Sequence, residues 1–158
     1  MFGKLIKITL KVFGVLALLI AITVGGIIGK EFGKAAVSST QEVEKQAKIN
    51  EDLNKAAQQI NATTPTMVDA ETRLDKASLG EDTRLIYHYT LINVDPQNVD
   101  KSWVKTTLRD SILPSVCSND KMISSIKFGV NFEYSYSGSN GVYLGSFTAN
   151  RDSCGFKS

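Results

Sequence analysis

An uncharged segment near the N-terminus constrains this chain more than any other feature. Residues 12–29 read VFGVLALLIAITVGGIIG, without a single Asp, Glu, Lys or Arg. A helix that crosses the hydrocarbon core of a bilayer needs about 20 apolar residues, and Lys11 at one end can extend its ammonium group to the headgroups. Core helices of globular proteins are rarely apolar on every side. The sequence therefore predicts a transmembrane helix over residues 12–29.

A cleaved signal peptide is the alternative interpretation of this segment. Its basic start fits such a peptide, and small residues such as Ala35 and Ala36 could precede a cut. Signal-peptide cores run to about 7–15 residues, so the greater length favours a retained anchor. Three lysines precede the segment, whereas two, Lys30 and Lys34, follow it. This bias predicts a basic cytoplasmic N-terminus, residues 1–11, and export of the rest of the chain.

Three glycines spaced four residues apart lie on one face of the expected helix, namely Gly25, Gly29 and Gly33. Small residues at this spacing allow two membrane helices to approach closely. The pattern predicts packing against another membrane helix or a homo-oligomer, although glycine is frequent in membrane helices in general.

Residues 30–64 are expected to form a helical stalk. The part from 34 to 62 has no Pro or Gly and is rich in Ala, Gln, Glu and Lys, which are strong helix formers. Ile49, Leu53, Ala56 and Ile60 fall at helical spacing, but the apolar stripe is thin upstream of them. A solvated stalk is therefore expected rather than a coiled coil, and Pro65 ends it.

Residues 65–158 predict an α+β domain. Alternation of apolar and polar residues predicts strands at 84–92, 130–137 and 142–149, and a weaker, highly charged strand at 72–79. Asp95 and Pro96 are typical of a helix start, and this helix should break or kink at Pro114. A second helix is expected at 120–128, ending at Gly129. The order ββααββ predicts a four-stranded, mainly antiparallel sheet with helices packed on one face.

The two cysteines, Cys117 and Cys154, fit a disulfide bond formed in an oxidising compartment, with two buried free thiols as the alternative. Their spacing excludes a redox CxxC motif, and a chain with one histidine lacks the ligands for a zinc site.

No set of residues in the sequence predicts catalysis. His88 is the only histidine and lies in mid-strand, which favours a structural role. Three carboxylates, Asp69, Glu71 and Asp75, alternate with basic residues and indicate a charge-balanced edge rather than an acid–base site. Gly138–Gly141 resembles a hairpin turn and not a phosphate loop. No enzyme activity, metal or cofactor is expected.

Five tyrosines are candidates for a recognition surface, because tyrosine offers a large contact area at low entropic cost; as core aromatics they would have no such role. They are Tyr87, Tyr89, Tyr134, Tyr136 and Tyr143. The formal net charge of +2 arises at the N-terminal end, and the remaining chain is almost neutral. A nucleic-acid partner is therefore not expected.

Several short stretches carry a resemblance to a known group of proteins. They are residues 65–69 and 72–74, Tyr87–Leu91, Val116-Cys117, and the strand Tyr134-Ser135-Tyr136 ahead of a final Cys. They resemble uncharacterised small envelope proteins of Gram-negative bacteria that have one N-terminal membrane span and a disulfide-containing periplasmic α+β domain. The resemblance implies a periplasmic location for residues 65–158 and brings no catalytic or binding residues with it.

The leading hypothesis is a non-enzymatic protein of the inner membrane, single-pass, whose periplasmic domain binds another envelope protein or supports assembly of an envelope complex. A domain that binds a lipid or small ligand between its helices and the tyrosine-bearing sheet face is the alternative. A secreted domain released by signal-peptide cleavage is the third.

Overall fold

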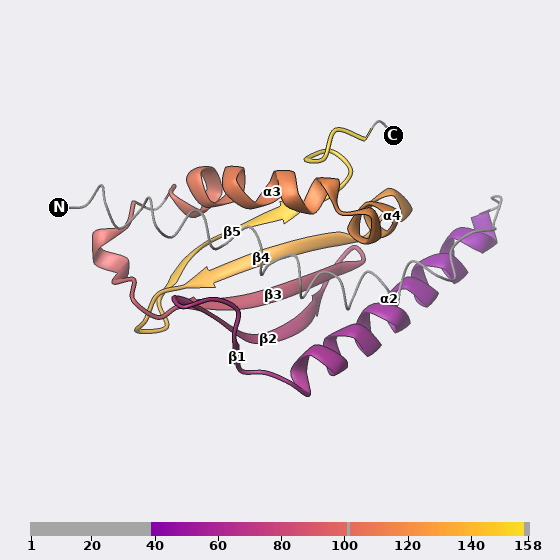
Figure 1. Ribbon diagram of the computed structural model, residues 1–158. Coiled ribbons are helices and arrows are strands. Elements are labelled where there is room, and N and C mark those ends of the chain that lie inside the picture. Colours follow the sequence, from indigo (N-terminus) through magenta and orange to yellow (C-terminus); the bar gives the residue numbers. More distant parts are fainter. Residues whose placement is uncertain (1–38, 101, 157–158) are drawn as a thin grey trace.

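Five strands form one mixed sheet within residues 39–100 and 102–156, the part of the chain that the computed structural model describes (Figure 1). The strands are β1 (Thr66–Met67), β2 (Thr72–Gly80), β3 (Arg84–Leu91), β4 (Asn131–Ser137) and β5 (Tyr143–Ala149), and they lie in the sheet in this order. The helices are α2 (Ser39–Asn61), α3 (Arg109–Ser118) and α4 (Asp120–Phe128). A 3₁₀ turn, η1 (Pro96–Asn98), and a π-helical turn, η2 (Val104–Leu108), precede α3.

The predicted membrane helix over residues 12–29, with Gly25, Gly29 and Gly33, lies outside the described residues. Among the helices that are described, none combines the length and the apolar character needed to cross a bilayer. The anchor, its orientation and the alternative of cleavage therefore stay predictions.

The α+β class is confirmed, and the elements from β2 to β5 follow the predicted order, but the four-stranded sheet is corrected to a five-stranded mixed one. The sheet is mainly antiparallel, as expected, with one parallel pair. β2–β3 and β4–β5 are antiparallel pairs, and β3 and β4 run parallel in the middle of the sheet. A parallel pair needs a long crossover, which α3 and α4 provide. The fifth strand, β1, is two exposed residues paired with Arg73 and Leu74 of β2. It is too short for its residues to show an alternating pattern.

One face of the sheet carries the core. In β3 the alternate residues Leu85, Tyr87, Tyr89 and Leu91 are buried, whereas the residues between them are more exposed up to His88. The neighbouring strands follow the same alternation, so the helices cover this face and leave the opposite face largely open. Helix α2 lies along the β2 side, and η2 with α3 lies along the β5 side (Figure 1).

The described part of the predicted stalk forms the helix α2, Ser39–Asn61, but the expectation that it is solvated is wrong for its second half. Ile49, Leu53, Ala56 and Ile60 are at most 6% exposed and belong to the domain core, packed against β2 and β3. Only the first turns of α2 project, as Val43 shows at 71% exposure. The four-residue stripe therefore belongs to a core helix, since burying it on the sheet removes its apolar area from water.

The crossover helix begins later than expected. Asp95 does accept a hydrogen bond from the backbone N–H of Gln97 at 3.0 Å, but it caps only η1. Asp100 then accepts a second bond from the backbone N–H of Ser102 at 2.7 Å, so two capping residues divide the segment. Pro114 lies inside α3, which continues to Ser118, so the first of the two predicted outcomes, a break rather than a kink, is not what occurs.

Helix α4 matches its predicted limits. Asn119 caps it by accepting from the backbone N–H groups of Lys121 and Met122, at 3.0 and 3.3 Å. Gly129 ends it at φ +107°, the left-handed conformation that favours glycine.

The outer edge of β2 is closed by a side chain beyond the short β1. The Asn61 amide nitrogen donates to the Ala77 carbonyl oxygen at 2.9 Å, and the Ala77 backbone N–H donates to Asn61 Oδ1 at 2.7 Å. The amide thus makes the two bonds that a residue of a neighbouring strand would make. The last residue of α2 is therefore fixed to the edge of the sheet.

Candidate functional site

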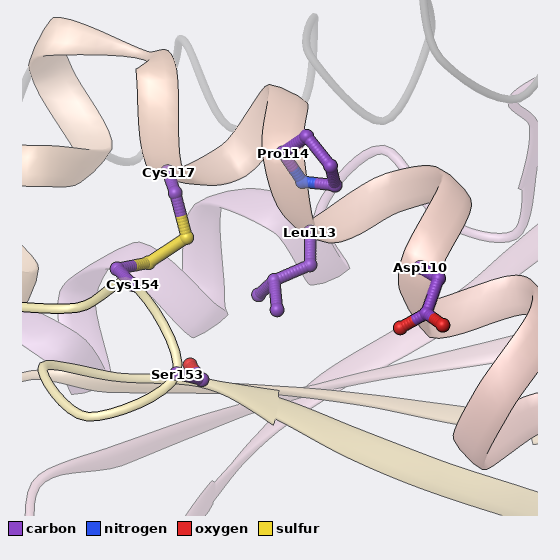
Figure 2. Close-up of a pocket in the computed structure, with 6 residues that line it drawn as sticks. All are labelled: Asp110, Leu113, Pro114, Cys117, Ser153 and Cys154. Atoms are coloured by element: carbon purple, nitrogen blue, oxygen red, sulfur yellow. A yellow bond between two sulfur atoms is a disulfide. The ribbon is translucent and has the colours of Figure 1, made fainter.

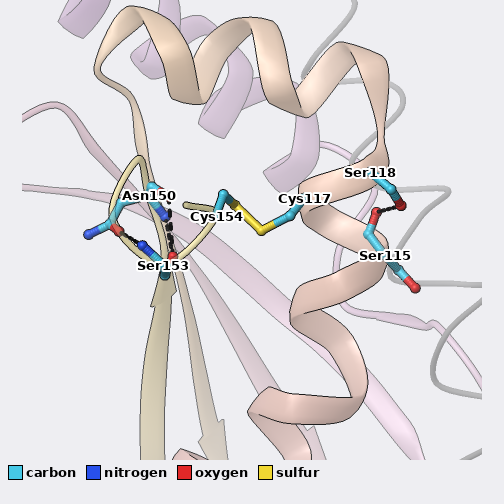
Figure 3. The surroundings of a disulfide bond; sticks show 6 residues. All are labelled: Ser115, Cys117, Ser118, Asn150, Ser153 and Cys154. Carbon is cyan, nitrogen blue, oxygen red and sulfur yellow. Dashed lines mark hydrogen bonds between the residues drawn. A yellow bond between two sulfur atoms is a disulfide. The ribbon is translucent and has the colours of Figure 1, made fainter. Parts of the chain in front are cut away.

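The disulfide predicted from the two cysteines is confirmed. Cys117 in α3 and Cys154 after β5 are bonded, with their Cα atoms 5.3 Å apart (Figure 3). The bond joins the last turn of α3 to the C-terminal turn that follows the sheet. Both ends of this junction are therefore held in one position.

The C-terminal turn has its own hydrogen bonds, which orient Cys154. The Ser153 backbone N–H donates to Asn150 Oδ1 at 2.9 Å, and the Asn150 backbone N–H donates to Ser153 Oγ at 2.8 Å (Figure 3). The Cys154 backbone N–H donates to the Asn150 carbonyl at 3.0 Å. Such reciprocal side-chain bonds stabilise a tight turn without help from the sheet.

An open depression of about 380 Å³ lies beside the disulfide, between α3 and the C-terminal turn (Figure 2). Its lining is mostly apolar and consists of Asp110, Leu113, Pro114, Cys117, Ser153 and Cys154. Leu113 forms part of the apolar wall at 8% exposure, and the Pro114 ring is exposed at the rim. We call this feature the disulfide depression.

One end of the disulfide depression is polar. The Asp110 side chain is 68% exposed and lies 3.0 Å from Arg109 Nη1, a surface ion pair of the kind that contributes at most about 1 kcal/mol. Because proline has no N–H, Pro114 cannot give the Asp110 carbonyl its α-helical donor. The Asp110 carboxylate therefore stands next to an apolar wall. The arrangement fits a side chain with an apolar stem and a cationic head, such as Lys or Arg.

Four of the five candidate tyrosines do not lie on a surface. Tyr87, Tyr89, Tyr134 and Tyr136 are 1–3% exposed and stack in the core, with ring centroids 5.1–6.4 Å apart. Burial raises the pKa of each of these phenols well above its usual range. Only Tyr143, 59% exposed, keeps a place on the surface. The predicted recognition surface is therefore corrected, because the sheet face that bears the tyrosines is the face under the helices.

Two of these phenols, Tyr87 and Tyr134, have buried hydroxyls without a hydrogen-bond partner among the described residues. A buried unpaired hydroxyl costs about 1–3 kcal/mol. The cost is offset by the stacking and burial of large rings.

His88 has a partner that the sequence did not reveal. Ser78 Oγ lies 2.7 Å from His88 Nε2, on the largely open face of the sheet. Burial, followed by the nearby Lys76 charge, lowers the pKa of the imidazole. Glu133, on the neighbouring strand, is engaged by Arg84 at 3.1 Å. Both carboxylates whose charge acts on His88, Glu133 and Asp75, are engaged by other side chains in the described part of the chain.

The carboxylates near β2 fit the predicted charge-balanced edge only in part, since Asp75 has a basic partner whereas Asp69 caps a turn. Asp69 accepts from the backbone N–H groups of Glu71 and Thr72, both at 2.8 Å, and shapes the turn before β2. Asp75 pairs with Arg73 and accepts from Thr90 Oγ1 at 2.6 Å. In the described part of the chain no group of three or more ligating side chains is placed to hold a metal ion.

These features define a disulfide-linked α+β domain with one buried sheet face. Residues 44–144 match the family described as a domain of unknown function, DUF8479, and the chain belongs to that family. The matched region begins inside α2, in agreement with the place of that helix in the core. No protein of curated function matches the chain.

Three solved structures share the fold. A protein from Pseudomonas aeruginosa that is proposed to be secreted aligns with a TM-score of 0.59 and 18% identity, covering 75% of this chain and 99% of that one. The type II secretion system pilotin AspS from Vibrio cholerae aligns with a TM-score of 0.56 and 16% identity, covering 72% and 98%. The type II secretion pilotin EpsS from Vibrio vulnificus gives 0.56 and 13%, covering 71% and 96%.

Proposed function

We propose that this domain is a non-enzymatic docking module that binds a segment of another envelope protein and supports the assembly of a membrane complex. The observation that carries the proposal is the disulfide depression, an apolar hollow with an exposed carboxylate, held between a helix and a cross-linked turn. The fold shared with two type II secretion pilotins supports the same class of function.

The proposed location is the periplasmic side of the inner membrane. A disulfide requires an oxidising compartment, and residues 12–29 supply the predicted span that would hold the domain there with residues 1–11 in the cytoplasm. Residues 30–38 would then connect this span to α2.

The proposed ligand is a peptide segment that places an aliphatic side chain against Leu113 and Pro114 and a Lys or Arg near Asp110. The carboxylate supplies the charge complement, and the apolar wall supplies buried area. A segment that makes both the apolar and the charged contact would bind more tightly than an acidic segment, which Asp110 would repel.

The alternative of a lipid or small ligand between helices and tyrosines is not favoured by the packing. Tyr134 and Phe147 stack with ring centroids 5.0 Å apart, and the aromatic rings fill the sheet face. The protein itself occupies the space that such a ligand would need.

Site-specific photo-crosslinking in cells tests the proposal. A photoreactive residue at Pro114 should capture a defined envelope protein, whereas one at the exposed Lys121 of α4 should not. Asp110→Lys should weaken capture at least several-fold. Asp120→Lys is the matched control, because Asp110 and Asp120 both stand in the first turn of a helix and only Asp110 lines the depression. Equal capture from Pro114 and Lys121, or equal effects of the two charge reversals, would refute the proposal.

A further inference from the structure

The two edges of the sheet differ in their hydrogen-bond partners. On one side β1 and the Asn61 amide occupy the edge of β2. On the other side β5 is the last strand, and no backbone hydrogen bond from another described segment reaches Tyr143–Ala149 beyond its ladder with β4. An edge strand carries a row of N–H and C=O groups that can pair with another strand.

The turn η2 packs over the face of β5. A Cβ added at Gly145 would lie 3.1 Å from Val104 Cβ, and a Cβ points out of the plane of a sheet. Val104 of η2 therefore lies above β5. Phe147 and Ala149 are buried on the same side, while Ser146 and Thr148 on the other side are partly exposed. The backbone edge between the two faces has no strand partner among the described residues.

The sequence of β5 lacks the usual protection of an exposed edge. Residues 142–150 read VYLGSFTAN and include no Lys, no Pro and no other charged residue. Natural edge strands commonly carry lysine, proline or a bulge to prevent pairing with other chains. In β5 such a device is the register shift near Leu144, next to Gly145 at φ +154°. From Gly145 to Ala149 the register with β4 continues without a further shift.

We propose that β5 pairs antiparallel with β5 of a second copy of this chain, about a two-fold axis at Phe147. In this register Gly145 lies opposite Ala149, and Ser146 lies opposite Thr148. Small residues then face small residues and hydroxyls face hydroxyls, with no like charges opposed. A two-fold contact must be complementary to itself, and this short strand meets that condition. The pair would join two sheets into one that is twice as wide. This edge is separate from the disulfide depression, so the inference does not depend on the proposed docking function.

Cysteine cross-linking of the full chain in membranes tests both the contact and its register. Chains with Ser146→Cys and with Thr148→Cys, differently tagged and co-expressed, should form a mixed disulfide dimer several-fold more than either variant alone. Directly opposite Cβ atoms are about 4.5–5.5 Å apart and diagonal ones about 7–8 Å. Ser135→Cys with Ser137→Cys is the matched control, because both lie on the same face in β4, an interior strand with neighbours on both sides. A dimer held by another surface would show no preference for the mixed pair and would overturn the proposal.

Sedimentation of the full chain in detergent gives a second measurement. The double variant Ser146→Lys, Thr148→Lys should shift the protein from dimer towards monomer, because each added lysine faces another across the axis. A monomeric wild-type protein, or a dimer that both lysines leave unchanged, would overturn the proposal. Cross-linking of the Ser146→Cys or Thr148→Cys chain to a different protein, in place of a second copy, would also overturn it.

Discussion

Replacing Asn61 by alanine should destabilise the domain although the residue is exposed and stands at the end of a helix. The substitution removes both hydrogen bonds to Ala77, at 2.9 and 2.7 Å. Each contributes about 1 kcal/mol, and the two backbone groups left behind are only partly accessible to water. We therefore expect the free energy of unfolding to fall by about 2 kcal/mol.

Urea denaturation of residues 39–158 followed by circular dichroism measures this loss. With a slope of about 1.5 kcal/mol/M, the midpoint should fall by about 1.3 M. Asn54→Ala is the matched control, since it makes the same substitution at an exposed position of the same helix. It should change stability by no more than about 0.5 kcal/mol in either direction.

The comparison separates two explanations of the Asn61 contact. If the amide pairs with the strand edge, Asn61→Ala must be clearly less stable than Asn54→Ala. Equal stabilities of the two variants would show that water replaces the amide without cost, and the edge-closing role of Asn61 would be wrong.

Three further outcomes follow from the core and the disulfide. The double variant Cys117→Ser, Cys154→Ser opens a loop with a sequence separation of 37 residues and should lose about 4 kcal/mol on the chain-entropy model, measured by urea denaturation; a loss below about 1 kcal/mol would contradict it. Tyr134→Phe removes a buried unpaired hydroxyl and should leave stability unchanged or raise it by about 1 kcal/mol, whereas a clear loss would indicate an ordered partner. Stability should fall as the pH rises above about 10, because the unfolded chain releases phenolic protons that the buried tyrosines, with raised pKa values, retain; absorbance at 295 nm should rise together with unfolding.

Local patterns in the sequence were sufficient for most elements of the fold. Alternation located four of the strands within a residue or two, and Gly129 marked the end of α4, because both signals depend on backbone geometry and on which side of a strand faces the core. The disulfide could also be expected, since an isolated pair of cysteines in a domain that the sequence predicts to be exported has few other uses. These predictions needed no knowledge of the tertiary arrangement.

The features that the sequence did not predict correctly share a physical cause: each depends on contact between segments far apart in the chain. The stripe on α2 was visible, but its burial depends on a sheet that begins after Pro65. Whether β3 and β4 run parallel depends on the path of the crossover, and the pairing of Ser78 with His88 depends on strand register. The same limit applies to the disulfide depression, because Asp110 and Ser153 come together only through the fold. The tyrosines were wrongly predicted to form a recognition surface, because the properties of tyrosine that suit it to recognition also suit it to a stacked core.

The integration of α2 into the core has a mechanical consequence for a domain proposed to hang from a membrane. A tension applied at Ser39 would first act on the exposed turns before Ile49 and would then load Ile49, Leu53 and Ile60 against the sheet, and Asn61 at its rim. From Ile49 onward the force would be transmitted into the folded body, and this part of α2 could be pulled away only by breaking core contacts.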